Sequence, residues 1–316
     1  MKLIVFDLEN KIPLLGLIFI GIIDRGTNLL QVRPTSVCNL NCPFCSVDSG
    51  AFSKRHKVNY EVECDYLLEE IEKVVEFKGD EIEINLDSVG EVLCYQEIEE
   101  LIKGLRKINN VKKISMQTNG FLYKKLDVDI MNFSIHALDS KLAKELAGVE
   151  CYDIDKVIVN LKKYLKDRVQ VRLCPVWIPK VNDEEIPKLI LLAKELGCEL
   201  GIQKYETYSY SRQIKRAKPL TWWKFYHQLE KWEKELDIKL KLTAKDVEIK
   251  KLKRIPEVFK KNDKVSVEIV CKGWIEGQMV GVAKGRCISI NKCNKDIGDQ
   301  VNVKILETKN NIYLAE

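Results

Sequence analysis

The sequence predicts an α/β protein in which a partly closed barrel of alternating strands and helices is followed by a small all-β barrel. Between about residues 66 and 210, apolar residues recur first at helical and then at strand spacing, several times in succession. From about residue 259 onward, the pattern changes to short alternating segments separated by turn residues. We therefore expect a boundary near residue 257, with a larger domain, 1–257, and a smaller one, 258–316.

In the larger domain, helix and strand patterns alternate. Residues 66–78 (YLLEEIEKVVEFK) have apolar positions at helical spacing, and residues 81–88 (EIEINLDS) alternate as a strand does. The same step recurs in YQEIEELIKGLRKI and KKISMQTNG, in MNFSIHA, and in YDIDKVIVNLKKYLK and VQVRLCPVWI. Such repeats predict a parallel sheet with right-handed crossovers, with functional side chains at the strand ends. We also expect an N-terminal strand before the repeats and a helical extension, LTWWKFYHQLEKWEKELDI, after them.

Short strand patterns fill the smaller domain. They are KVSVEIV, WIEGQMVGVAKGRCISI, DQVNVKILET and NIYLA. Five short strands in fewer than sixty residues predict a small antiparallel barrel.

The composition is that of a globular protein with a well-buried core, at 46% hydrophobic and 31% charged residues in 316. The most apolar run, PLLGLIFIGII at 13–23, is much shorter than the roughly 20 residues of a membrane span and does not read as a signal peptide. We therefore expect a cytoplasmic monomer without a membrane partner. The eleven cysteines are then free, buried or metal-bound thiols rather than a disulfide framework.

Positive charge is concentrated in one interval. Residues 203–257 contain 15 Lys and Arg against 8 Asp and Glu, whereas the whole chain carries only +5. One interpretation is contact with nucleic-acid phosphates, for which Arg212, Lys215 and Arg216 are the candidates. The other is a solvated helical face in a chain rich in lysine and glutamate.

Three cysteines, Cys38, Cys42 and Cys45, lie within eight positions of the segment SVCNLNCPFCSVDSG. A closed zinc or iron–sulfur site normally has four protein ligands, so one ligand is missing. The Cys-x3-Cys-x2-Cys spacing, with Phe44 before the third cysteine, resembles the radical S-adenosylmethionine (radical SAM) superfamily. The resemblance implies that the thiolates hold a [4Fe–4S] cluster whose fourth iron binds S-adenosylmethionine. A zinc site completed by another residue, such as His56, is the alternative.

The segment VGEVL resembles the Gly-Gly-Glu-Pro element of that superfamily, which receives the methionine amino group. Gly90 and Glu91 match this element, whereas Val89 and Val92 replace its first glycine and its proline. The resemblance implies that Gly90 and Glu91 bind the cofactor. A surface carboxylate at a strand end is the alternative for Glu91.

Three later segments, MQTNGFL, NFSIHA and VQVRLCPV, resemble the strand ends that follow in this superfamily. They imply that Asn119 and Ser134 approach the ribose and carboxylate of the cofactor, and that Arg172 pairs with the methionine carboxylate. Phe44 completes the implied cofactor-binding residues. An ordinary turn is the alternative for Asn119, because Gly120 follows it.

Two further side chains lie on these strands. Cys174 is the candidate catalytic residue, and a small buried thiol is the alternative. We interpret His136 as a hydrogen-bonded structural histidine.

The C-terminal segment, from about 264 to 316, resembles a TRAM domain, a small RNA-binding barrel of oligonucleotide-binding type found on tRNA- and rRNA-modifying enzymes. The matching stretches are GVAKG, the following Arg286, IGDQVNVKI and NNIYLA. Such barrels bind nucleic acid through exposed basic and aromatic side chains, which makes Trp274, Lys284 and Arg286 the candidate contacts. Core packing is the alternative for Trp274.

Together the two resemblances imply an RNA-modifying radical SAM enzyme. Because no cysteine precedes Cys38, methylthiolation is disfavoured, and C–H functionalisation such as methylation of a tRNA or rRNA base is preferred. An electron donor such as ferredoxin or flavodoxin would reduce the cluster. The order of modules, with GLIFIGIIDRGTNLLQVRPT before the cysteines, is also similar to a group of archaeal iron–sulfur oxidoreductases. The alternatives are a radical SAM enzyme acting on a protein or small metabolite, and a non-catalytic RNA-binding protein with structural zinc.

Overall fold

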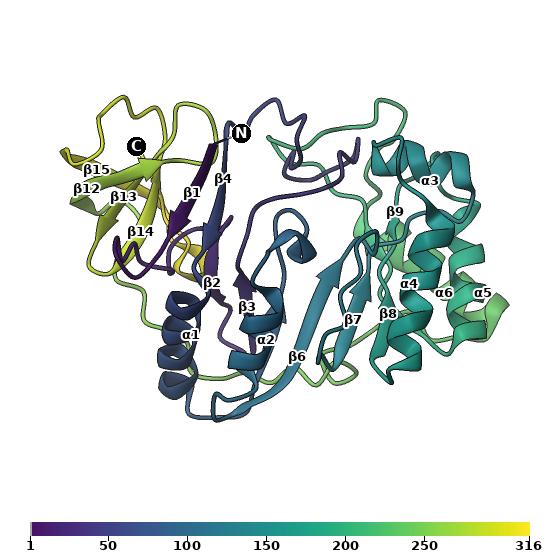
Figure 1. Ribbon diagram of the computed structural model, residues 1–316. Coiled ribbons are helices and arrows are strands. Elements are labelled where there is room, and N and C mark those ends of the chain that lie inside the picture. Colours follow the sequence, from purple (N-terminus) through teal and green to yellow (C-terminus); the bar gives the residue numbers. More distant parts are fainter. Residues whose placement is uncertain (1) are drawn as a thin grey trace. The chain divides into compact units, whose positions relative to one another are not determined.

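The computed structural model describes residues 2–316, which form two compact units (Figure 1). The first unit contains the residues up to Cys38, Ser53–Ile114 and Lys250–Glu316; the second contains Asn39–Phe52 and Ser115–Ile249. Each unit is therefore assembled from segments that are distant in the sequence.

Strands and helices alternate in the first unit after its N-terminal part. Strand β2 (Gly21–Asp24) pairs antiparallel with β3 (Leu29–Arg33), which pairs parallel with β5 (Ile82–Leu86). A separate parallel pair joins the N-terminal β1 (Lys2–Phe6) to β4 (Val58–Val62). The helices are α1 (Cys64–Lys78), the 3-10 helix η1 (Val92–Cys94) and α2 (Ile98–Leu105). The run at 13–23 supplies Leu14, Leu17, Phe19 and Ile20 to the core, which explains its apolar character.

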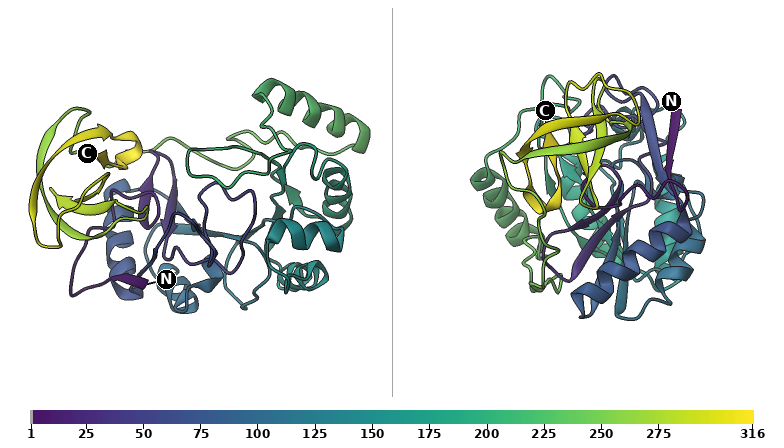
Figure 2. Two further views of the ribbon diagram at one scale, coloured as in Figure 1. Left: turned by 90° about the horizontal axis from the view of Figure 1, so that it is seen from above. Right: turned by 90° about the vertical axis from the view of Figure 1, so that its left-hand side faces the viewer.

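The C-terminal part of the first unit is a closed barrel of five strands (Figure 2). In spatial order they are β12 (Lys264–Lys272), β13 (Met279–Ala283), β14 (Arg286–Ile290), β16 (Leu314–Ala315) and β15 (Gln300–Glu307). The 3-10 helix η2 (Lys309–Asn311) connects β15 to β16. Buried residues including Phe259, Ile269, Ile288 and Tyr313 fill the barrel. The expected small barrel is confirmed, except that β14 and β16 pair in parallel because the returning strand closes the barrel beside β14.

The barrel is packed into the rest of the first unit. The Cys287 N–H donates to Leu15 O at 2.8 Å, and the Tyr313 N–H donates to Gly16 O at 3.0 Å. Gly16 has a φ of 128°, and a Cβ at this position would overlap the Cys287 carbonyl oxygen. Tyr60 Oη donates to Lys272 O at 2.7 Å. The boundary near residue 257 thus remains a prediction, because residues on both sides of it lie within one compact unit.

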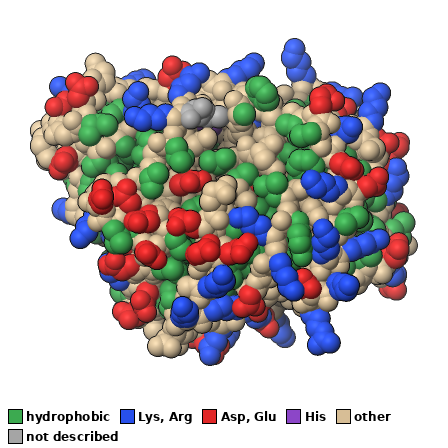
Figure 3. Space-filling view, in the orientation of Figure 1, with side chains coloured by type: hydrophobic (Ala, Val, Ile, Leu, Met, Phe, Trp, Pro, Cys, Tyr) green, Lys and Arg blue, Asp and Glu red, His purple; other side chains and the backbone are tan. Residues whose placement is uncertain are grey.

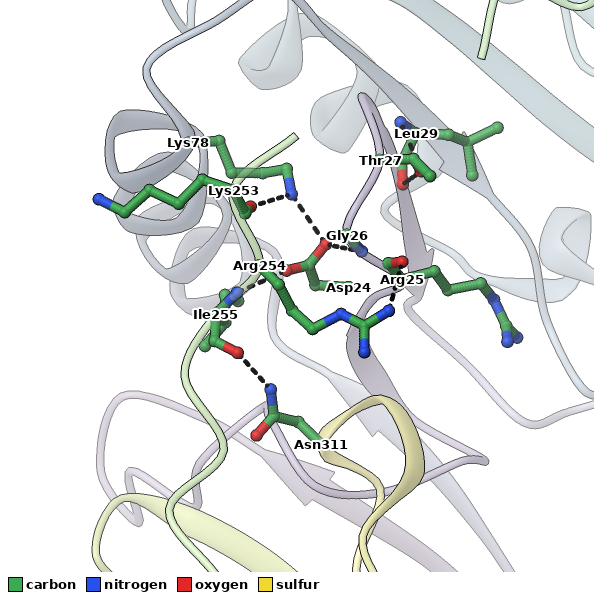
Figure 4. A network of polar contacts seen from close by, with 10 residues as sticks. All are labelled: Asp24, Arg25, Gly26, Thr27, Leu29, Lys78, Lys253, Arg254, Ile255 and Asn311. Carbon is green, nitrogen blue, oxygen red and sulfur yellow. Dashed lines mark hydrogen bonds and ion pairs between the residues drawn. The ribbon is translucent and has the colours of Figure 1, made fainter. Parts of the chain in front are cut away.

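A buried ion pair fixes the segment that leads into the barrel (Figure 4). Lys78 Nζ lies 2.8 Å from Asp24 Oδ1, with both side chains essentially inaccessible to solvent, and also donates to Lys253 O at 3.0 Å. Asp24 accepts two backbone N–H groups as well, from Gly26 and Ile255, each at 2.8 Å. The carboxylate therefore joins the end of β2, the last residue of α1 and the segment 253–255.

The second unit continues the alternation with parallel strands. β6 (Val111–Thr118) enters from the first unit and pairs with β7 (Ile130–Phe133), which pairs with β8 (Gln170–Leu173), which pairs with β10 (Glu199–Leu200). A short parallel pair joins β9 (Val176–Trp177) to β11 (Gln203–Lys204). The helices are α3 (Ser140–Ala147), α4 (Ile154–Lys166), α5 (Glu185–Leu196) and α6 (Trp222–Leu236). This arrangement confirms the expected alternation of parallel strands with helices.

Side-chain caps explain where several of these helices begin. Asp139, Asp153 and Thr221 each accept a backbone N–H in the first turn of α3, α4 and α6, respectively. Across the described residues no helix is both long and apolar enough to cross a bilayer. On the face drawn in Figure 3, basic and acidic side chains both occur, so charge alone does not single out a function there.

Candidate functional site

The residues just before Cys38 are hydrogen-bonded to the loop that follows β5, which contains Gly90 and Glu91. The Glu91 N–H donates to Val37 O at 2.7 Å. A Cβ at Gly90 would overlap the carbonyl oxygens of Ser36 and Val37, so only glycine allows this close approach. The sequence-predicted Gly90 and Glu91 therefore lie directly beside the backbone that positions Cys38.

Glu91 is buried, with 2% of its surface exposed, which excludes a surface carboxylate. Its Oε1 accepts the Leu93 N–H at 3.0 Å, at the start of η1. The Gly90 N–H in turn donates to Ser88 Oγ at 2.9 Å. A side chain that accepts a backbone N–H at a helix N-cap is held in a fixed orientation.

The other two cysteines share one turn in the second unit. The Cys45 N–H donates to Cys42 O at 3.1 Å, and the Asn41 N–H donates to Ala147 O at 2.9 Å. The Ser49 N–H donates to Cys45 Sγ at 3.3 Å. A backbone N–H directed at sulfur stabilises a thiolate, the form that binds iron.

Arg212 holds this turn from the far end of the second unit's sequence. Its Nε lies 3.1 Å from Asp48 Oδ1, and its backbone N–H donates to Cys45 O at 2.9 Å. Its guanidinium also donates to Asn41 Oδ1 and to the Ser49 carbonyl. The side chain is only 18% exposed. The interpretation of Arg212 as a phosphate contact is therefore not supported, because its donors are used within the cysteine loop.

Burial affects the protonation of Cys42. Burial, together with the neighbouring Cys45, raises the pKa of Cys42 to about 12, and the charge of Arg212 opposes this rise. A thiolate at Cys42 thus needs positive charge close by, which iron supplies. Within residues 2–316, no three His, Cys, Asp or Glu side chains already converge as a metal-binding group. The donor chemistry of Cys42 and Cys45 nevertheless fits thiolate ligation of iron.

Asn119 and Ser134 make specific contacts in the second unit. Asn119 Nδ2 donates to Asn39 Oδ1 at 2.7 Å, so Asn119 contacts the residue that follows Cys38. Asn119 Oδ1 also accepts the Phe121 N–H at 3.0 Å, as the turn interpretation expects. Ser134 Oγ accepts from Gln117 Nε2 at 3.1 Å.

Phe44 is buried and meets His136 edge to face, with ring centroids 4.9 Å apart. His136 Nδ1 accepts the Val176 N–H at 3.1 Å, which places the ring proton on Nε2. Burial lowers the pKa of His136 to about 4. His136 is therefore a neutral, hydrogen-bonded residue that supports the aromatic side chain in the cysteine loop.

Arg172 already has a carboxylate partner within the chain. Its Nε and Nη2 lie 2.8 and 2.6 Å from Glu199 Oε2, and its Nη1 donates to Asn132 Oδ1 at 3.3 Å. Pairing with a methionine carboxylate would require this arrangement to change. Cys174 is buried and its Sγ lies 3.9 Å from the same Asn132 oxygen. Burial raises its pKa to about 12, so Cys174 is a protonated thiol at neutral pH.

The three barrel candidates differ in exposure. Trp274 is buried and stacks on His56, with centroids 3.9 Å apart and planes 8° apart, so it offers no face to a base. The core-packing interpretation accounts for Trp274, and His56 Nδ1 is already bonded to Trp274 O at 2.9 Å. Lys284 is exposed, with Nζ 5.4 Å from the Phe259 ring. Arg286 is partly exposed, and its guanidinium donates to the carbonyls of Gly285 and Pro256.

Sequence reasoning missed Asp48, Asn39 and Glu199, and it did not anticipate that Arg212 is paired within the cysteine loop. The ion pair between Asp48 and Arg212 joins residues 164 positions apart (212 minus 48), so no local pattern signals it. Lys215 and Arg216 remain exposed, and Arg216 Nη2 lies 3.5 Å from Glu145 Oε1. These two residues stay candidates for phosphate contact.

Comparisons with known proteins agree with the cysteine motif. A model of the Radical SAM superfamily matches residues 32–193. The uncharacterized protein MJ0103 of Methanocaldococcus jannaschii is 37% identical over 345 aligned residues, covering 98% of this chain and 79% of that protein. The probable GTP 3′,8-cyclase of Sulfurisphaera tokodaii is 30% identical over 188 residues, and the chain spans only 55% of its length.

Similarity to solved structures extends to the fold. The crystal structure of Streptococcus suis SuiB has a TM-score of 0.52 at 19% identity, covering 68% of this chain and 48% of SuiB. The S-adenosylmethionine-bound form of SuiB has a TM-score of 0.50 at the same identity. With the cysteine spacing and the superfamily match, these findings lead to one assignment. The chain belongs to the radical SAM superfamily, and its cofactors are a [4Fe–4S] cluster and S-adenosylmethionine.

Proposed function

We propose that this radical SAM enzyme modifies RNA by functionalising a C–H bond of a tRNA or rRNA base, with methylation as an example. When bound, the cluster and S-adenosylmethionine supply a 5′-deoxyadenosyl radical that abstracts hydrogen. The observation that carries the RNA assignment is the closed five-stranded barrel at residues 264–315, in the segment whose sequence resembles a TRAM domain. Small barrels of this size commonly bind oligonucleotides through an exposed strand face.

The chain's own residues have separate tasks in this proposal. Cys38, Cys42 and Cys45 hold the cluster, and Arg212 keeps the turn that contains the last two in one conformation. Glu91, fixed by its contact with Leu93, receives the methionine amino group. Asn119, Ser134 and Phe44 also contribute to the binding of S-adenosylmethionine in this proposal.

RNA affinity is assigned to basic side chains that are exposed or partly exposed. Lys284 and Arg286 lie at the turn between β13 and β14. Lys215 and Arg216 lie in a segment before α6 that contains no Asp or Glu. Electrostatic contacts with phosphates weaken steeply with salt. The enzyme also needs an electron donor, for which ferredoxin or flavodoxin is the proposed class.

The decisive experiment compares nucleosides from tRNA and rRNA of a deletion strain and the wild type by mass spectrometry. We expect one modified nucleoside to be absent from the deletion strain and to return with the wild-type gene, but not with a Cys42→Ala gene. Identical nucleoside profiles would contradict the proposal. Deleting the barrel is not a clean test in vitro, because the barrel packs against residues 15–16 and Tyr60 of the same unit. Charge reversal of Lys284 and Arg286 in the full chain is the better variant.

A small nucleotide is the second candidate substrate. The observation that favours it is the likeness to proteins named GTP 3′,8-cyclase, which covers 55% of this chain. A GTP-dependent increase in the cleavage of S-adenosylmethionine, with no effect of RNA, would favour this candidate. Stimulation by RNA alone would exclude it.

A further inference from the structure

The first two turns of α6 expose three large aromatic side chains. Trp222, Trp223 and Tyr226 are 56%, 71% and 46% exposed. An adjacent side of the helix is anchored in the core, where Phe225 and Trp232 are buried and pack against Trp177 with ring centroids 5.9 and 5.0 Å apart. The helix is therefore fixed by its buried face, and core packing does not account for the exposed rings. We call Trp222, Trp223 and Tyr226 the aromatic platform.

The exposed rings are ordered by contacts along the helix. Trp222 stacks on Tyr226, with centroids 5.7 Å apart and planes 25° apart, and Trp223 stacks on His227 at 5.0 Å and 8°. Both are i,i+4 pairs, which lie on the same side of a helix. Lys204 Nζ lies 5.0 Å from the centre of the Trp222 ring. Rings held in this way lose little conformational freedom when another flat group stacks on them.

Positive charge predominates in the sequence around the platform, although Glu206 pairs with Lys204 at 2.6 Å and Glu230 Oε2 lies 3.9 Å from His227 Nδ1. Residues 207–229 contain no Asp or Glu, whereas they contain five basic residues, namely Arg212, Lys215, Arg216, Lys218 and Lys224. Arg212 is used in the cysteine loop, and the other four are exposed. The aromatic platform also lies at the N-terminal end of a 15-residue helix, whose dipole favours negative charge, and the first turn contains no acidic residue. The ligand should therefore combine flat aromatic groups with negative charge.

We infer that the aromatic platform binds single-stranded RNA, with bases stacked on Trp222 and Trp223 and the adjoining phosphates held by Lys215, Lys218 and Lys224. This inference rests on the proposed function and deepens it by naming a binding surface outside the barrel. Stacking is tolerant of sequence because every base presents a flat face. A duplex would bind weakly, since its bases are already stacked on each other.

The chemistry of α6 disfavours a membrane surface as the ligand. Insertion into a lipid interface requires an apolar stripe along the helix. Beyond Tyr226, however, the exposed residues of α6 include the charged Lys231, Lys234 and Glu235, and its apolar residues Leu229 and Trp232 are buried. The exposed apolar surface is therefore limited to the first two turns.

The test measures binding of the anaerobically prepared full chain to a fluorescent, unstructured RNA of about 12 nucleotides, a size that one or two stacking sites can cover. Trp223→Ala should weaken binding by about 5- to 150-fold, the effect of losing one stacked base, and Trp223→Phe should restore most of it. Leu191→Ala is the matched control, because Leu191 is 51% exposed on α5 of the same unit. Its affinity should equal that of the wild type. Lys218→Ala should reduce the slope of log affinity for RNA against log salt concentration by about 1, the effect of losing one phosphate contact.

The outcomes separate this inference from the proposed function. If the wild type binds RNA and Trp222→Ala and Trp223→Ala bind equally well, the platform is overturned while RNA modification stands. If the wild type has no salt-sensitive RNA affinity and no nucleoside depends on the gene, the proposed function fails and the platform fails with it. If the platform variants lose the same affinity for duplex RNA as for single-stranded RNA, base stacking on the platform is also overturned. If Trp222→Ala and Trp223→Ala lose binding to vesicles with about one quarter anionic lipid but bind RNA as the wild type does, the ligand of the platform is a membrane surface and not RNA.

Discussion

Replacing Arg212 by alanine should reduce retention of the iron–sulfur cluster, although Arg212 is not expected to touch iron. Its guanidinium pairs with Asp48 at 3.1 Å, and the two side chains are 18% and 3% exposed. Removing one member of a buried ion pair costs about 3–5 kcal/mol. Here that cost falls on the loop conformation that also contains Asn41, Cys45 and Ser49.

The expected size of the effect follows from this cost. If the loop must be ordered before it binds the cluster, the apparent affinity for the cluster is proportional to the fraction of molecules in which the loop is ordered. A cost of about 3 kcal/mol then corresponds to about 150-fold weaker retention. Arg212→Lys should be intermediate, because an ammonium keeps the charge but cannot reproduce the planar donors of the guanidinium.

Iron content and visible absorption of anaerobic protein, followed during competition with a chelator, measure this effect. Cys42→Ala is the positive control and should lose iron. Arg216→Ala is the matched negative control, because Arg216 is 57% exposed and its Nη2 lies 3.5 Å from Oε1 of a similarly exposed Glu145. Wild-type iron retention by Arg212→Ala, combined with weaker RNA binding, would refute the positioning role and restore the phosphate-contact interpretation.

Three other variants test the site and the fold. Glu91→Ala should weaken S-adenosylmethionine binding by about 1.5–3 kcal/mol in calorimetry while iron content is kept, because a hydrogen bond to a charged group is lost; unchanged affinity would move this role elsewhere. Lys78→Met should lower the free energy of unfolding by about 3–5 kcal/mol in urea titrations, and adding Asp24→Asn should recover part of this loss; an additive double variant would contradict the coupling. Between pH 7 and pH 4, the wild type should lose about 3 kcal/mol more free energy of unfolding than His136→Gln does. The reason is that the unfolded histidine takes up a proton below about pH 6.5, whereas burial lowers the pKa of His136 in the folded protein to about 4. Parallel pH profiles would contradict this assignment.

The alternation of strands and helices was predictable because each element has its own hydrophobic period. The small barrel was predictable for the same reason, but the parallel pairing of β14 with β16 was not. That pairing depends on how the chain returns after η2, which no period in the sequence records. Position in the chain likewise does not reveal that the barrel shares a compact unit with Gly16 and Tyr60.

The cysteine motif could be recognised because it is a local pattern, whereas the cofactor roles of Gly90 and Glu91 remain predictions. Burial decided the cases that local patterns could not. Trp274 has the residue type of an RNA contact, but it stacks on His56 in the core. Arg212 lies in the most basic segment of the chain, yet its charge is used by Asp48. The aromatic residues of α6 show the reverse, since their helical pattern indicated amphipathicity and only the structure showed which of them are exposed.

The packing of the barrel against the N-terminal segment affects how the protein is made. Cys287 Sγ donates to Pro13 O at 3.1 Å across 274 residues of sequence. At translation rates of about 5–20 residues per second, the ribosome needs roughly 14–55 s to produce the later partner after the earlier one. During this time the barrel residues that contact the apolar segment 13–23 have not yet been synthesised. Apolar segments exposed in this way are prone to aggregate or to bind chaperones. Folding of the first unit is therefore completed only after the strands of the barrel have been synthesised.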